Sequence, residues 1–385
     1  MRRAKRIVWM LNGILLMVIL MFGVIYLIGS SKGLLNEDSQ KEVEQKRATQ
    51  IMVEGDSNDI ASPSKKRRTG EGKKPTTIVL GGDIVLKESH LENYKEKGIS
   101  GLVSSEVLEI IQKADIAMIN EEFAFTNEEE STREEDTYRV APKYVSVFNE
   151  LGIDLVSLAN NHIIDYGKHA LLEGISTLDA AQIKHVGAGE TLEQASTIQY
   201  VEVNGYTIAF VAASRVMPEE SWAATETDAG VFSAYDRERV CKQVKEASEN
   251  ADFVIAYVHW GMEYKTKVDR EQRELGQALV DAGADVVFGS HNHCLQGIEY
   301  YKGCPILYSL GNLIFDQTQK KTAIVTISLS GRTEPELAIH PCFLKNGKTD
   351  LTTKRSSVSS FYEYMMSISQ NTQIGSGGEI RSKGE

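Results

Sequence analysis

Two histidines, His291 and His293, are separated by one residue and follow the mostly apolar run 285–288 and the Gly289-Ser290 pair. An apolar run that ends in such a turn is typical of a β-strand whose last side chains reach the carboxyl edge of an α/β sheet, where these folds bind ligands. Imidazole is among the commonest metal ligands in proteins. A histidine pair alone is often structural, but this placement predicts a site that can hold one or two metal ions.

Four further apolar runs end in the same way, in polar side chains that can bind metal or transfer protons. Core packing alone would scatter such residue types along the elements, so their repeated place after an apolar run indicates one shared site. The runs lead into Gly81-Gly82-Asp83, Asn120-Glu121-Glu122, Asn160-Asn161-His162 and His259-Trp260-Gly261.

The candidate ligands combine carboxylates with imidazoles and are numerous enough for two divalent ions. This mixture of oxygen and nitrogen donors suits Mn²⁺, Fe, Zn²⁺ or Mg²⁺ rather than a thiolate site. Two ions bridged by a carboxylate can activate a water and hold a phosphoryl or acyl oxygen. The predicted metal ligands are Asp83, Glu122, Asn161, His259, His291 and His293.

His162 follows Asn161 directly, so we expect its side chain in the same pocket without a need to bind metal. A histidine there can donate a proton to a leaving group, which makes it the candidate catalytic acid. Asp165, three residues further on, has two roles that the sequence leaves open. It can orient His162, or it can be the N-cap of the helix expected over 166–181.

Apolar runs and helical patterns alternate from residue 76 onwards and must position these side chains. Helices are expected where apolar residues recur at helical spacing, and strands where short apolar runs stand between them. The Asn204-Gly205 pair predicts a type I′ hairpin, and Lys302-Gly303 a second hairpin. Helices are predicted over 143–151, 168–181, 236–251 and 270–282, and strands over 154–158, 253–258, 285–288, 322–329 and 337–344. This order predicts an α/β fold with mixed β-sheets, two of them stacked, flanked by helices.

An uncharged apolar run covers residues 7–28 and follows a basic segment at 1–6. At about 1.5 Å per residue, the run is long enough to cross the core of a bilayer. The basic flank predicts a cytoplasmic N-terminus. A cleaved signal peptide is the alternative, but its apolar core usually has only about 7–15 residues. We therefore expect one transmembrane helix that anchors the chain in the cell membrane, with the rest of the chain extracytoplasmic.

Composition divides the remaining chain into three parts. Residues 29–75 are polar and charged and predict a flexible linker, 76–345 hold the alternating elements of the globular domain, and 346–385 form a C-terminal tail with a short helix near 361–366. Residues 375–385 are expected to be disordered.

Charge and cysteine content limit the partners and the redox chemistry. The formal net charge is −12, and basic residues concentrate in the first 75 residues. The acidic remainder argues against binding of nucleic acid. The four cysteines form no CxxC motif. Cys294 and Cys304 can bridge across a turn outside the cytoplasm, but their spacing leaves this open. Cys294 adjoins His293 and is expected to be a buried thiol rather than a ligand.

In linear order, the motifs Gly-Asp, Asn-x-Glu, Asn-Asn-His, His-Trp-Gly and His-x-His resemble the CapA family of capsule poly-γ-glutamate biosynthesis proteins, which is similar to the calcineurin-like metallophosphoesterases. The resemblance covers about residues 76–316 and is most specific at 158–167, 259–264 and 283–316. It implies a metallophosphoesterase-like layered fold.

The resemblance also implies the role of each candidate ligand. Asp83 and His293 would hold the first ion, Glu122 would bridge, and Asn161, His259 and His291 would hold the second, with His162 as the acid. Glu121 competes with Glu122, which the Asn-x-Glu spacing favours.

Two positions depart from the phosphoesterase pattern. Val85 stands where those enzymes carry the histidine of Asp-x-His, so the first ion loses a ligand. Ser290 stands where the Gly-x-His-x-His motif often has a histidine.

By this resemblance, the chain would act in the synthesis, export or anchoring of poly-γ-glutamate or a related anionic polymer, at the membrane and with capsule synthase subunits. Its chemistry would be metal-dependent hydrolysis or transfer at an amide or a phosphate ester. Two alternatives stay open. A non-catalytic scaffold could bind the polymer through cations, as the loss at Val85 suggests, or the chain could be a metal-dependent phosphodiesterase unrelated to capsule.

Overall fold

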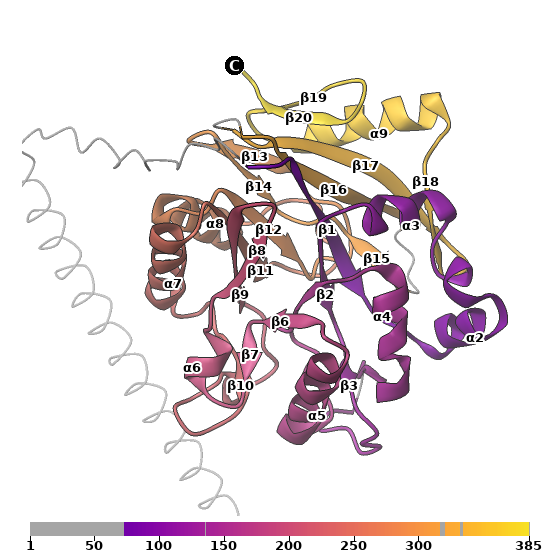
Figure 1. The fold of residues 1–385 in the computed structure, drawn as a ribbon, viewed down its shortest axis with the longest axis vertical. Helices are drawn as coiled ribbons and strands as arrows, with labels where there is room; N and C mark the ends of the chain where they lie inside the picture. Colours follow the sequence, from indigo (N-terminus) through magenta and orange to yellow (C-terminus); the bar gives the residue numbers. More distant parts are fainter. Residues whose placement is uncertain (1–72, 135, 316–319, 332–333, 385) are drawn as a thin grey trace, which may run out of the picture. The chain divides into compact units, whose positions relative to one another are not determined.

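The computed structural model describes residues 73–134, 136–315, 320–331 and 334–384. These residues form a mixed α/β fold in which two large β-sheets carry helices on their outer sides (Figure 1). The membrane anchor predicted at 7–28 lies outside the described residues. Among the helices that the structure describes, none is long and apolar enough to span a bilayer.

The larger sheet has ten strands and contains both parallel and antiparallel pairs. Its strand order is β19-β20-β17-β16-β1-β2-β5-β6, with β15 paired to β1 and β18 paired to β17. Strands β1, β2, β5 and β6 run parallel, whereas β16 and β17 are antiparallel to their neighbours. The strands are β1 (Thr76–Ile84), β2 (Ile116–Glu121), β5 (Leu155–Ser157), β6 (Lys184–Val186), β15 (Asn312–Ile314), β16 (Lys321–Leu329), β17 (Glu336–Lys345), β18 (Lys348–Leu351), β19 (Thr372–Ile374) and β20 (Glu379–Ser382).

The second sheet has six strands in the order β13-β14-β12-β11-β9-β8. Both predicted hairpins are confirmed here, because β8 pairs with β9 and β13 with β14 in antiparallel fashion. Asn204 and Gly205 have φ values of 52° and 85°, the positive values that a type I′ turn requires. The strands are β8 (Gln199–Val203), β9 (Tyr206–Ser214), β11 (Phe253–His259), β12 (Val286–Ser290), β13 (Ile298–Tyr301) and β14 (Cys304–Leu307).

Three hydrophobic cores hold the layers together. The core between the sheets joins side chains such as Met118 of the larger sheet to Phe210 and Phe288 of the smaller one. A second core lies between the larger sheet and helices that include α3, α4 and α5, and a third lies between the smaller sheet and α7 and α8. The helices are α2 (Glu88–Lys97), α3 (Ser105–Gln112), α4 (Ser146–Leu151), α5 (Gly167–Ala180), α6 (Leu192–Ala195), α7 (Arg237–Asn250), α8 (Arg270–Ala282) and α9 (Arg355–Ile368).

The remaining elements are short. Strands β3 and β4 form one two-stranded ladder, and β7 and β10 form another. The short elements are β3 (Ala124–Phe125), β4 (Arg139–Val140), β7 (Ala188–Gly189), β10 (Gly230–Val231) and the 3₁₀ turns η1 (Gly98–Gly101), η2 (Pro142–Val145) and η3 (Glu220–Trp222).

The C-terminal segment is more ordered than the sequence indicates. The helix expected near 361–366 is present as α9, and Phe361 and Met365 pack into the core between the sheets. The prediction of disorder is wrong for residues 375–384, because β20 pairs with β17 and Ile380 is buried in the same core. Ile380 is the one apolar residue of β20, and the segment forms a strand because β17 offers an edge to pair with.

Candidate metal centre

All the predicted site residues lie at the carboxyl ends of strands or in the loops that follow them. The parallel strands β1, β2 and β5 of one sheet, and β11 and β12 of the other, end at the same edge of the fold. Residues that are far apart in the sequence therefore converge there, and each is at most 7% exposed. They are Asp83 of β1, Glu122 after β2, Asn161, His162 and Asp165 after β5, His259 of β11, and His291 and His293 after β12.

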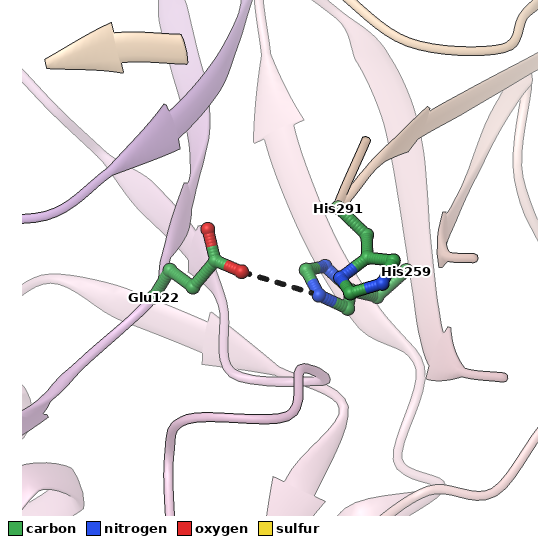
Figure 2. Close-up of side chains that lie close together, drawn as sticks. All are labelled: Glu122, His259 and His291. Carbon is green, nitrogen blue, oxygen red and sulfur yellow. Dashed lines mark ion pairs between the residues drawn. The ribbon is translucent and has the colours of Figure 1, made fainter. Parts of the chain in front are cut away.

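The structure sorts the predicted carboxylate and histidine ligands into two groups that share Glu122. Ligand atoms of Glu122, His259 and His291 lie within 4.8 Å of one another, and so do those of Asp83, Glu122 and His293. Figure 2 shows the Glu122 carboxylate directed at the His259 ring, with the His291 ring beside it; Oε1 lies 3.3 Å from Nε2 of His259. The other oxygen, Oε2, lies 3.9 Å from Nδ1 of His293. One carboxylate thus faces both groups, as a bridging ligand would.

The ring of His259 is held from both sides. Its Nε2 faces the site and lies 2.7 Å from Oδ1 of Asn161. Its Nδ1 lies 3.0 Å from the Tyr257 hydroxyl and 3.2 Å from Oγ of Ser290. Ser290, which departs from the phosphoesterase pattern, thus contacts the nitrogen that points away from the site. Such partners fix the tautomer and orientation of a metal-binding imidazole.

Asp83 is positioned by close packing of the backbone. A Cβ on Gly82 would lie 1.7 Å from the carbonyl oxygen of Gly311, so only glycine permits this approach. The Asp83 carboxylate accepts hydrogen bonds from Nδ2 of Asn120 at 2.8 Å and from the backbone N–H of His291 at 3.2 Å. These bonds leave Oδ2 3.4 Å from Nδ1 of His293.

The turn after β12 carries an unusual backbone. His291 and His293 have φ values of 91° and 50°, in a region that non-glycine residues seldom occupy. Such conformations cost about 1–3 kcal/mol each and cluster at functional sites. Here they turn both rings into the cluster.

The cluster buries a carboxylate that lacks a hydrogen-bond donor in the described part of the chain, and a bound divalent cation would compensate its charge. Both carboxylate oxygens of Glu122 and Nδ1 of His291 are buried and have no hydrogen-bond partner among the described residues. Burial, and then the Asp83 charge, raise the pKa of Glu122 well above its usual value. Burial, and then His293, lower the pKa of His291 to about 3, and burial lowers the pKa of His259 well below its ordinary value. Neutral imidazoles and orphaned carboxylate oxygens are the donors that a metal ion requires, so these residues fit one.

The structure separates Glu121 from Glu122. Asn120 and Glu121 are successive residues of β2, so their side chains point to opposite faces of the sheet, and Asn120 bonds to Asp83 in the site. Glu121 belongs to neither ligand group. Burial alone raises the pKa of its carboxyl group well above the usual value. Of the two candidates, Glu122 is the one that faces the cluster.

His162 and Asp165 form a buried pair beside the metal ligands. Nδ1 of His162 lies 2.7 Å from Oδ2 of Asp165, which also accepts from the backbone N–H of Tyr138 at 2.9 Å. Arg133 donates to the other carboxylate oxygen at 3.1 Å. The N-cap of α5 is Tyr166 rather than Asp165, and the Tyr166 side chain makes no capping hydrogen bond. Of the two roles left open for Asp165, the geometry therefore supports orientation of His162.

Trp260, Tyr264 and the four cysteines also stand out by residue type, and the structure shows the surroundings of each. Trp260 is buried and donates through Nε1 to the backbone oxygen of Tyr308 at 2.9 Å, so it belongs to the core. Tyr264 is 47% exposed, and its ring centroid lies 6.1 Å from that of His293. All four cysteines are free thiols, and burial raises the pKa of Cys294 to about 11, which makes it a poor ligand.

Several supporting residues carry no functional signal in the sequence. Tyr257 lies inside an apolar run, and Arg133 lies in an acidic loop, so neither stands out. Asn120 opens the Asn-x-Glu motif, but the motif alone gives it no role. Asn312 follows a glycine, which is typical of a turn residue, although its Oδ1 lies 2.9 Å from Nδ1 of His293.

Comparison with known proteins finds a family and several relatives. Residues 77–317 match the family model described as "Bacterial capsule synthesis protein PGA_cap". The chain is 38% identical over 179 residues to the PGA biosynthesis protein CapA of Bacillus subtilis, covering 46% of this chain and 47% of that protein. It is 36% identical over 217 residues to the capsule biosynthesis protein CapA of Bacillus anthracis, covering 53% and 51%. The chain thus spans about half the length of these relatives.

Solved structures show remoter similarity. A phosphatase from Mycoplasma pneumoniae aligns with a TM-score of 0.46 at 11% identity, covering 71% of this chain and 94% of that one. The NAD nucleotidase of Haemophilus influenzae aligns with a TM-score of 0.43 at 12% identity, covering 77% and 57%.

Proposed function

Because the chain belongs to the family of bacterial capsule synthesis proteins described as PGA_cap, we propose that it serves poly-γ-glutamate capsule biosynthesis, export or anchoring as a hydrolase or transferase with two divalent metal ions. Membership confirms the resemblance that the motifs indicated. The observation that carries the proposal is the Glu122 carboxylate, buried, without a hydrogen-bond partner among the described residues, and shared by both ligand groups.

The site residues support two distinct roles, metal binding and proton donation. Asp83, Glu122 and His293 would hold one ion, and Glu122, Asn161, His259 and His291 the other. Ions held there would supply Lewis-acid activation of a carbonyl or phosphoryl group and of the attacking water. His162 would donate a proton to the leaving group, because it lies beside the ligands without belonging to either group. Asp165 would keep its ring in place.

The proposed substrate is an anionic polymer, and the rim of the site offers a cation for it. Nζ of Lys87 lies 5.2 Å from the ring centroid of Tyr138 and 5.1 Å from that of Phe315. Both rings also contact residues of the site. The centroid of the Tyr138 ring lies 4.4 Å from that of His162, and the Phe315 ring stacks on the His293 ring with their centroids 4.8 Å apart. Lys87 and the metal ions would offset the acidic character of the chain where the polymer approaches.

The proposal includes a place in the cell. The apolar run at 7–28 and its basic flank support a single-pass anchor in the cell membrane with the described domain outside the cytoplasm, next to capsule synthase subunits.

One observation favours a second candidate, a non-catalytic scaffold that binds the polymer through cations. Val85 is apolar and 2% exposed at the position where the resemblance to phosphoesterases places a histidine ligand. A weakly held first ion would impair turnover more than polymer binding.

The test compares wild type and His162→Ala as purified full-length chains with Mn²⁺ or Zn²⁺. Each is incubated with poly-γ-glutamate and with a phosphodiester, and chain shortening or released product is measured. Metal-dependent cleavage of the polymer that falls in His162→Ala would support the hydrolase. Cleavage of the phosphodiester alone would instead support a phosphodiesterase unrelated to capsule. No turnover, with equal polymer binding by both chains, would favour the scaffold.

Metal affinity is expected to rise with pH. Burial would lower the pKa of His293, but the carboxylates of Glu122 and Asp83 outweigh it and raise the pKa to about 10. An ion that binds this nitrogen must displace a proton, so affinity should increase about tenfold per pH unit for each proton released below pH 10. His259 and His291 are already neutral near pH 7 and add no such dependence. Calorimetric titration with Mn²⁺ at pH 6.5, 7.5 and 8.5 measures the slope; an affinity independent of pH would contradict it.

A further inference from the structure

Asn312 reaches the candidate metal centre from a strand that supplies none of the ligands predicted from the motifs. It begins β15, which pairs in parallel with β1 so that Asn312 lies opposite Asp83. The backbone N–H of Val85 donates to the carbonyl oxygen of Ile314 in the same strand at 2.8 Å. The strand that carries Asn312 is therefore hydrogen-bonded to the segment where the expected histidine ligand is missing.

Three oxygen atoms converge on one nitrogen of His293. Its Nδ1 lies 2.9 Å from Oδ1 of Asn312, 3.4 Å from Oδ2 of Asp83 and 3.9 Å from Oε2 of Glu122. Neighbouring ligands of one ion with bonds of about 2.0–2.2 Å lie roughly 3.0–3.5 Å apart. The four atoms thus have close to the spacing of a coordination shell.

The two ligand groups each have an asparagine oxygen beside a histidine nitrogen. In the group of Glu122, His259 and His291, Oδ1 of Asn161 lies 2.7 Å from Nε2 of His259, the nitrogen that faces Glu122. A residue that only orients a metal-binding histidine contacts the nitrogen that points away from the metal, as Tyr257 and Ser290 do for His259. Asn312 contacts the nitrogen that faces the carboxylates, which is the position of Asn161 and not of Ser290.

We propose that Asn312 is a ligand of the ion held by Asp83, Glu122 and His293, and that its side-chain oxygen replaces the ligand lost at Val85. The first ion then has four protein ligands, as the second has with Glu122, Asn161, His259 and His291. Asn312 is buried, and its Nδ2 has no hydrogen-bond partner among the described residues. The amide is therefore held through its oxygen, as a ligand would be. The inference rests on the proposed two-ion site but not on catalysis.

The test counts bound ions on the purified full-length chain rather than activity. Wild type, Asn312→Ala and Asn312→Asp are equilibrated at fixed free Mn²⁺ or Zn²⁺, and bound metal is measured by mass spectrometry, with the Mn²⁺ paramagnetic resonance spectrum to separate paired from single ions. We expect two ions in wild type and one in Asn312→Ala, with the affinity for the other weakened at least about 10–100-fold. Asn312→Asp should keep both, because a carboxylate can take the same place.

Asn292→Ala is the matched control. Asn292 is buried between the two histidines in the sequence, and its amide donates to the backbone oxygen of Met262 at 2.8 Å. It should keep both ions. If Asn312→Ala does not fold, Asn312→Ser, whose hydroxyl is too short to reach, gives the same comparison. Wild-type affinity for both ions in the folded Asn312→Ala or Asn312→Ser chain would overturn the inference, and so would a wild type that binds fewer than two ions. A wild type that binds two ions but cleaves nothing would refute the hydrolase and leave Asn312 as a ligand.

Discussion

Glu122→Gln is expected to abolish binding of both metal ions and, without metal, to make the chain more stable than wild type. Glu122 is the residue that both ligand groups share, so its loss affects both ions. Its carboxylate is buried, and its pKa is raised because burial and Asp83 disfavour the charge. Glutamine carries no charge, so the variant avoids that cost. Ions stabilise wild type by about 2.7 kcal/mol for each site at a free concentration 100 times the Kd, and the variant should lose this gain.

The measurement is the melting temperature with EDTA and with Mn²⁺ at several pH values. Because the folded-state pKa of Glu122 is raised, the folded chain binds the proton more tightly than the unfolded chain does. The contribution of this group is therefore present at low pH and is lost as pH rises above 4.5. The advantage of Glu122→Gln in EDTA should thus grow from pH 5 to pH 8.

Glu121→Gln is the control that separates burial from metal binding. Glu121 is equally buried, and its pKa is also raised, but it lies outside both ligand groups. It should gain stability in EDTA and still respond to Mn²⁺. An equal Mn²⁺ response in Glu122→Gln and wild type would show that Glu122 does not bridge two ions.

His162→Ala is expected to reduce turnover by about 10²–10⁴-fold while both ions stay bound, since a positioned general acid contributes about that factor. The loss should depend on the leaving group. A substrate that releases p-nitrophenolate or another stable anion needs no proton, so the variant should lose far less activity on it than on an unactivated ester or amide. Kinetics on such a matched pair, with bound metal quantified for each chain, measure the effect.

Two further variants test the assignment of His162. Asp165→Asn keeps a side chain of the same size beside Nδ1 of His162, but it removes the charge and replaces one acceptor oxygen by an amide donor, so its loss should follow the same leaving-group pattern. His185→Ala removes a histidine that pairs with Asp179 at 3.3 Å, outside the site, and should leave kinetics unchanged. Equal losses on both substrates in His162→Ala would point to positioning of substrate rather than to proton donation.

Much of the site is visible in the sequence because it follows from local patterns. Each apolar run that ends in polar residues predicts a strand and its carboxyl end, and parallel strands place those ends at one edge. Residue type and position along the chain are therefore enough to assign Asp83, Asn161, His259, His291 and His293 to one site. The hairpin at Asn204-Gly205 is local in the same sense, since its turn chemistry needs no distant partner.

Other features depend on contacts between residues far apart in the chain. The sequence left the role of Asp165 open, and the bonds from Arg133 and the Tyr138 backbone to its carboxylate assign it to His162 rather than to the helix end. The strand at 379–382 forms because β17 offers an edge to pair with, which the local pattern at the C-terminus cannot indicate.

The sequence by itself therefore determined which residue types gather at the strand ends, and the family whose motifs they match. Only the tertiary structure decided which of those side chains lie close together, including Glu122 rather than Glu121 in the ligand groups and the approach of Asn312 to His293. The physical reason is that residue type and spacing are properties of the local chain. Which side chain faces which depends on strand pairing, on the face of the sheet and on the packing of the two sheets.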